Sequence, residues 1–158
     1  MSAGLFSGLL ALNVVAAGLF AAVNFGLLRK LSAHRIVPFA CGVQCLATGI
    51  LLAHVTLMTP SLEVVVALIM CSMGVAGMVG GNAGACFLAH FPDIRATASG
   101  VAGSVQFLVG GIAGTVLGIV HTGTLAATAS IVTLCALVAL LSLRFARPPA
   151  EAVSAPHE

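Results

Sequence analysis

Charged residues are scarce in this sequence, and their scarcity excludes a soluble fold. Asp, Glu, Lys and Arg make up 6% of the 158 residues, whereas ordinary soluble domains contain about 25%. Apolar residues account for 60% of the chain. A soluble globular chain needs polar groups over its exterior, and six basic and four acidic side chains cannot supply them. We therefore expect lipid to surround the protein.

Residue patterns that carry chemistry are also missing. The five cysteines form no C-x-x-C pair and have no His or acidic residue at ligand spacing, so no metal site is predicted. There is no nucleophile with a matched base and no cofactor motif, so we expect neither an enzyme nor a bound cofactor. The basic residues form no stripe that could follow phosphates, which argues against a nucleic-acid partner.

Long apolar runs are the dominant feature that is present. Cut at charges, prolines and polar clusters, they predict five membrane-spanning helices of about 20 residues or more. The predicted spans are residues 3–28, 36–57, 62–90, 96–120 and 125–143. Residues 148–158 form a polar, proline-containing tail that we expect to be disordered and cytoplasmic. The predicted fold class is therefore all-α, polytopic and embedded in a membrane.

The basic residues all follow odd-numbered spans. They are Arg29, Lys30 and Arg35 after the first span, Arg95 after the third, and Arg144 and Arg147 after the fifth. Because Lys and Arg are retained on the cytoplasmic side, this pattern predicts an external amino terminus and a cytoplasmic carboxyl terminus. Residues 1–28 lack the positive n-region of a signal peptide. An external Met1 without a signal peptide is expected of a piece that lacks earlier helices.

Small and polar residues recur at helical spacing within the spans, where they favour close helix contact. We predict helix packing through Asn13 and Asn24 of the first span, Gly77 and Gly84 of the third, and Gly103, Gly110, Gly114 and Gly118 of the fourth. An amide inside the membrane needs a polar partner, which is either a neighbouring helix or a transported molecule. Both interpretations stay open for the Asn and Gln residues.

The amino-acid sequence resembles one membrane-protein family over nearly its whole length, to about Arg147. The matching segments are Gly8 to Val15, Asn24 to Leu31, Gly81 to Ala85, Phe91-Pro92, Ala96 to Gly103, Gln106-Phe107 and Gly110-Gly111. They resemble the major facilitator superfamily, and most of all its Bcr/CflA drug-efflux subfamily. Ser32 is a departure, since the family usually has glycine at that point.

The resemblance implies that the five spans correspond to helices eight to twelve of a transporter in the bacterial inner membrane. The chain would then be the carboxyl-terminal portion of a proton-coupled multidrug antiporter that exports small amphipathic compounds. It would be incomplete and inactive without the missing amino-terminal half, which would be its partner. In the family's layout the third span lines the cavity, and the first and fourth spans face the other half. The substrate-path candidates are then Met78, Asn82 and Gln106.

An alternative function is kept beside this one. The chain is then a non-transporting membrane protein that binds or regulates a partner through the glycine-rich face of the fourth span, at Gly110, Gly114 and Gly118. Such a face permits close approach of a second helix in the membrane. Neither interpretation identifies the proton-coupling group, because no Asp or Glu lies within a predicted membrane core.

Overall fold

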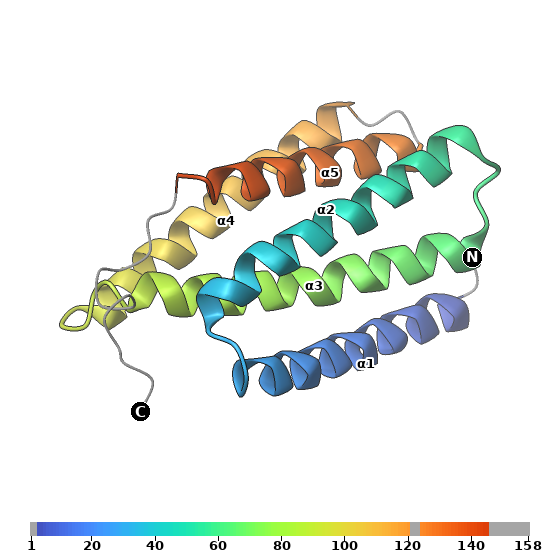
Figure 1. Ribbon diagram of the computed structural model, residues 1–158. Helices are drawn as coiled ribbons and strands as arrows, with labels where there is room; N and C mark the ends of the chain where they lie inside the picture. The colour runs from blue at the N-terminus through green and yellow to red at the C-terminus, as the bar shows by residue number, and fades with distance from the viewer. Residues whose placement is uncertain (1–2, 121–123, 146–158) are drawn as a thin grey trace.

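The computed structural model describes residues 3–120 and 124–145, which form five α-helices. The helices are α1 (Ala3–Leu28), α2 (Ala33–Leu57), α3 (Leu62–Leu88), α4 (Arg95–Val120) and α5 (Leu125–Ser142) (Figure 1). Each of the five contains a segment long and apolar enough to cross a membrane. The prediction of an all-α chain with five membrane-length helices is therefore confirmed. Arg147 and the predicted tail lie outside the described residues.

The helix ends differ slightly from the predicted spans, for local reasons. α2 begins at Ala33 rather than residue 36, because Ser32 has extended backbone and serves as the residue that precedes the first turn. α3 ends at Leu88 rather than residue 90. Its end is closed by amides of His90 and Phe91, which donate to Phe87 and Leu88 carbonyls at 3.1 and 3.2 Å. Pro92 follows at once and cannot continue a helix.

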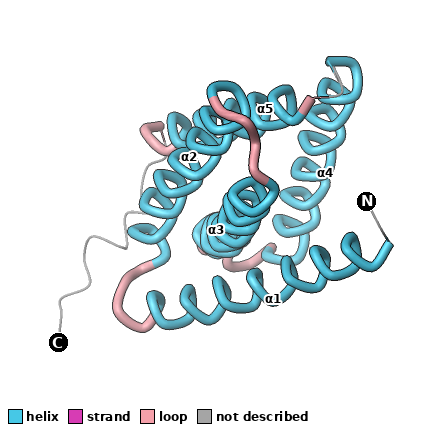
Figure 2. Tube along the Cα trace, turned by 90° about the vertical axis from the view of Figure 1, so that its right-hand side faces the viewer, coloured by secondary structure: helices cyan, strands magenta, loops and turns pink. Residues whose placement is uncertain are grey.

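Successive helices run antiparallel to one another, and α3 lies among the others. Figure 2 views α3 nearly end-on, with α1, α2 and α4 around it. α2 packs most extensively on α3 and also packs on α5, whereas α1 packs mainly on α3. Among the described helices, α4 touches α3 and α5, and it touches each of them slightly. The described chain is thus a compact group of α1, α2, α3 and α5 with α4 loosely attached.

The buried core lies where α2, α3 and α5 meet. Leu51 of α2, Val65 of α3 and Ala129 of α5 form a buried cluster there. Ile36 and Thr48 of α2 are also fully buried. The small side chain of Ala129 permits α5 to approach α2 closely. Helices in lipid associate through such close packing, because the hydrophobic effect does not favour helix contact over lipid contact.

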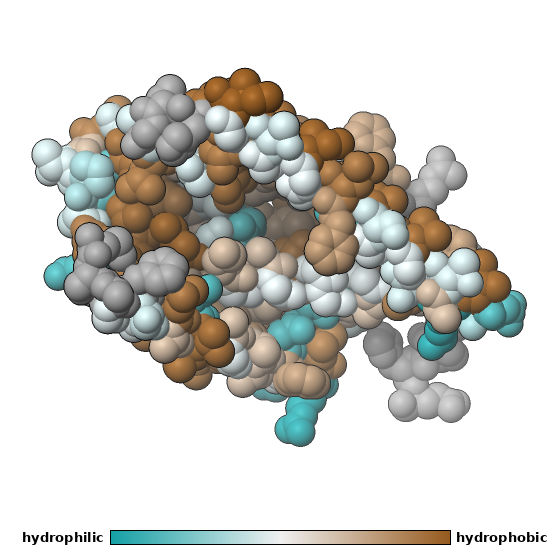
Figure 3. All heavy atoms as spheres, turned by 180° about the vertical axis from the view of Figure 1, so that it is seen from behind, coloured by the Kyte–Doolittle hydropathy of each residue, from teal (hydrophilic) through white to brown (hydrophobic). Residues whose placement is uncertain are grey.

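The outside of the bundle is apolar. Figure 3 shows one face, on which brown apolar and pale intermediate residues cover most of the surface and teal hydrophilic residues are few. In the most apolar 18-residue segment of α1 and of α4 no residue is buried, whereas 39% of the residues in the corresponding segment of α2 are buried. Exposed apolar surface on this scale suits contact with lipid or with further helices.

Candidate functional site

Asn82, a predicted substrate-path residue, joins α3 to α1. Its side chain is only 2% exposed. The Nδ2 atom donates to Oδ1 of Asn24 at 2.7 Å and to the Met78 carbonyl at 2.8 Å. Both amide hydrogens are therefore used within the protein. Met78, also a substrate-path candidate, is buried one turn earlier. A role for these two residues in the substrate path stays a prediction.

We expect Asn82→Leu to lower the free energy of unfolding by about 0.6–1.7 kcal/mol, which spans the average and the largest values for a hydrogen bond between membrane helices. The substitution removes the bond to Asn24 and leaves that amide without its partner. Denaturation with sodium dodecyl sulfate in lipid micelles, followed by thiol labelling, measures the change. Gln106→Leu is the matched control, because Gln106 is exposed and should not affect the stability of the isolated chain. Equal stabilities of the two variants would contradict the assignment.

Two further polar contacts connect α2 to its neighbours. Gln44 donates through Nε2 to Oγ of Ser72 in α3 at 2.8 Å. Its Oε1 atom is buried and has no partner among the described residues. Thr133 of α5 donates to the Thr48 carbonyl of α2 at 3.0 Å and to the Ala129 carbonyl at 2.7 Å. Polar bonds thus connect α1 to α3, α3 to α2, and α2 to α5.

Sequence reasoning missed Ser72 and Thr133. In α5 a signal was available, since Thr133 lies four residues after Ala129 and three before Ala136, and both alanines are buried. Small residues at that spacing mark a contact face in a membrane helix. Ser72 also begins a run of small residues at four-residue spacing, with Ala76 and Gly80, but these two are exposed, and the crossing of α2 over α3 selects Ser72 alone.

The predicted packing glycines meet open space within the described chain. A Cβ atom added at any of the predicted positions would have nothing within 4 Å: Gly77, Gly84, Gly103, Gly110, Gly114 and Gly118. Gly74, which was not singled out, behaves differently, because a Cβ there would overlap the ring of Phe20 in α1. Packing through the predicted glycines therefore stays a prediction.

Two other predicted residues have side-chain amides without a hydrogen-bond partner among the described residues. Gln106 of α4 is exposed and Asn13 of α1 is half-buried, and neither forms a hydrogen bond with a described residue. Each lies within an apolar helix of membrane length. An amide that faces hydrocarbon without a partner is costly, so both positions favour contact with something beyond this chain.

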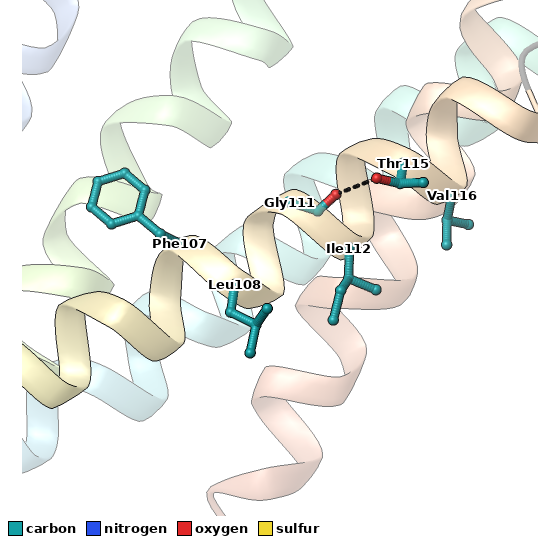
Figure 4. A pocket seen from close by; sticks show the side chains of 6 residues that line it. All are labelled: Phe107, Leu108, Gly111, Ile112, Thr115 and Val116. Atoms are coloured by element: carbon teal, nitrogen blue, oxygen red, sulfur yellow. Dashed lines mark hydrogen bonds between the residues drawn. The ribbon is translucent and has the colours of Figure 1, made fainter.

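A shallow hollow on α4 offers little to a ligand. It is lined by Phe107, Leu108, Gly111, Ile112, Thr115 and Val116, all from that one helix (Figure 4). The Thr115 hydroxyl donates to the Gly111 carbonyl at 2.8 Å, so the hollow's hydroxyl group is already engaged. The hollow is a stretch of apolar helix surface.

The described residues contain no group of three or more His, Cys, Asp or Glu side chains that could hold a metal ion. The five cysteines are free thiols. The described topology residues, Arg29, Lys30, Arg35, Arg95 and Arg144, are all exposed. Comparison of the chain with protein-family models, with curated proteins and with solved structures finds no match.

Proposed function

We propose that the chain is the carboxyl-terminal helical portion of a proton-coupled efflux transporter for small amphipathic compounds. Further transmembrane helices would complete it by packing against α1 and α4. The observation that carries the proposal is the state of α4. This membrane-length helix has no buried residue in its most apolar 18-residue segment, and the side-chain amide of Gln106 has no partner among the described residues.

The side-chain amide of Asn13 in α1 also lacks a partner among the described residues, so α1 resembles α4 in this respect. In the family that the sequence resembles, the helices corresponding to α1 and α4 are those that face the other half of the transporter. The unburied state of both helices supports that arrangement. The three polar connections among α1, α3, α2 and α5 support a body that moves as one unit when two halves rock about a central site.

The proton-coupling group would come from the missing helices. The two acidic residues in the described part of the chain, Glu63 and Asp93, lie at the start of α3 and in the loop after it. Export driven by a proton gradient needs a titratable group within the membrane. The proposal therefore requires that the reading frame upstream of Met1 encode further apolar spans, and unrelated coding sequence there would count against it.

Export of ethidium, a small amphipathic cation, from cells that carry the gene in its native context tests the proposal. Gln106→Leu should slow proton-driven export by about fivefold, the value of one hydrogen bond of about 1 kcal/mol. Val105→Leu is the control, since Val105 is the preceding exposed residue of α4 and has no polar group. Deletion of the gene without any change in ethidium export would overturn the proposal.

A second candidate function is a non-transporting protein that binds a partner through α4. The open space around Gly110, Gly114 and Gly118 favours it, because a second helix could approach closely there. Purification from native membranes separates the two candidates. A partner that is lost with Gly114→Phe but kept with Val116→Phe, together with unchanged ethidium export, would support this second function.

A further inference from the structure

The described basic residues gather at one end of the bundle. α1, α3 and α5 end there and α2 and α4 begin there, at the left of Figure 1. This brings together Arg29, Lys30, Arg35, Arg95 and Arg144, which are all exposed. The acidic residue described at this end is Asp93, and none of the basic residues forms an ion pair within the described chain. The described residues of this end therefore carry more positive than negative charge.

The turn between α1 and α2 holds the densest part of this charge. Arg29, Lys30 and Arg35 lie within seven consecutive residues, on either side of Ser32. The turn is ordered by the amides of Lys30 and Leu31, which both donate to the Leu27 carbonyl, at 2.9 and 2.7 Å. Three basic residues thus lie in this turn and in the first turn of α2.

The start of α2 adds hydrogen-bond donors to this charge. Ser32 precedes the first turn, but its side chain makes no capping hydrogen bond, and the first turn contains no acidic residue. The first amides of α2 that find a carbonyl are those of Arg35 and Ile36, which donate to Ser32 at 2.9 and 3.2 Å. The earlier amides of Ala33 and His34 have no described acceptor. Free amides at a helix start favour an anion.

Apolar side chains beside the turn indicate the source of that anion. Phe25 and Leu28 near the end of α1 are 73% and 41% exposed, and Phe39 near the start of α2 is 68% exposed. Acyl chains can cover these side chains, whereas a free phosphate would leave them uncovered. The turn also joins two apolar helices of membrane length, so we expect it at the depth of lipid headgroups.

We propose that the α1–α2 turn binds the headgroup phosphate of an anionic phospholipid in the surrounding leaflet. The guanidinium groups of Arg29 and Arg35 and the ammonium group of Lys30 would supply charge, and the Ser32 hydroxyl would donate a hydrogen bond. This inference does not depend on the proposed transport function, because it concerns the outer surface of the bundle.

Thermal unfolding of the purified full chain in a non-ionic detergent tests this binding. The chain has no Trp or Tyr, so a thiol-reactive dye that reports the exposure of its five free cysteines is the suitable probe. Phosphatidylglycerol at a hundredfold excess over its Kd should raise the Tm by about 5 °C. Phosphatidylcholine at the same concentration should leave the Tm unchanged.

The combined variant Arg29→Gln, Lys30→Gln and Arg35→Gln should lose the shift with phosphatidylglycerol. The matched variant Arg95→Gln and Arg144→Gln changes cations of the same end outside the turn, and it should keep the shift. Arg35→Gln alone, which should halve the shift, serves if the triple variant does not fold. An equal shift in the triple variant, with phosphatidylcholine, or with inorganic phosphate in place of lipid would overturn the proposal.

Discussion

Leu51→Ala is expected to lower the free energy of unfolding by about 1–3 kcal/mol. Leu51 is 8% exposed and packs with Val65 and Ala129, where three helices meet. In soluble proteins such a truncation costs about 2–5 kcal/mol, which includes the transfer of methylenes from water. In a bilayer the unfolded helices already lie in an apolar solvent, so the transfer contribution falls away and the lost packing remains.

Leu46→Ala is the matched control for this prediction, since Leu46 belongs to the same helix and is 64% exposed. Its truncation exchanges one lipid contact for another and should change stability by less than about 0.5 kcal/mol. Reversible denaturation with sodium dodecyl sulfate in lipid micelles, followed through thiol exposure, measures both variants. Similar losses for Leu46→Ala and Leu51→Ala would show that the cluster of α2, α3 and α5 does not form the core.

Gly74→Val should destabilise the bundle by about 1–3 kcal/mol through overpacking. A Cβ atom at this position would overlap the ring of Phe20, so α1 must move away from α3 or the ring must leave its place. Because α1 packs mainly on α3, a shift there also strains the hydrogen bond between Asn24 and Asn82. The same micelle denaturation experiment measures the loss.

A double-mutant cycle with Phe20→Ala makes this prediction specific. Removing the ring opens the space that a larger side chain at position 74 would fill, so Gly74→Val should cost much less in that background. Gly77→Val is the control, because nothing lies within 4 Å of a Cβ at Gly77. The packing assignment fails if Gly77→Val is as damaging as Gly74→Val, or if Phe20→Ala gives no relief.

The residues that join the helices show where sequence reasoning stops. Asn24 and Asn82 are 58 positions apart, and each was predicted as polar within a helix, without its partner. Gly74 and Gly77 are of one residue type on one helix, but only Gly74 meets an aromatic ring. A side chain inside the membrane acquires its partner from the crossing of two helices, and periodicity within one helix contains no information about that crossing.

The number of helices, their approximate limits and the position of the basic residues after odd-numbered spans could all be predicted from the amino-acid sequence. These follow from local chemistry, since a bilayer demands about 20 apolar residues per crossing and prolines and charges end each run. The shared core of α2, α3 and α5 and the weak contacts of α4 emerged from the folded arrangement of the described helices. Contacts between residues distant in the chain depend on how closely small side chains let particular helices approach, which is a property of pairs of helices.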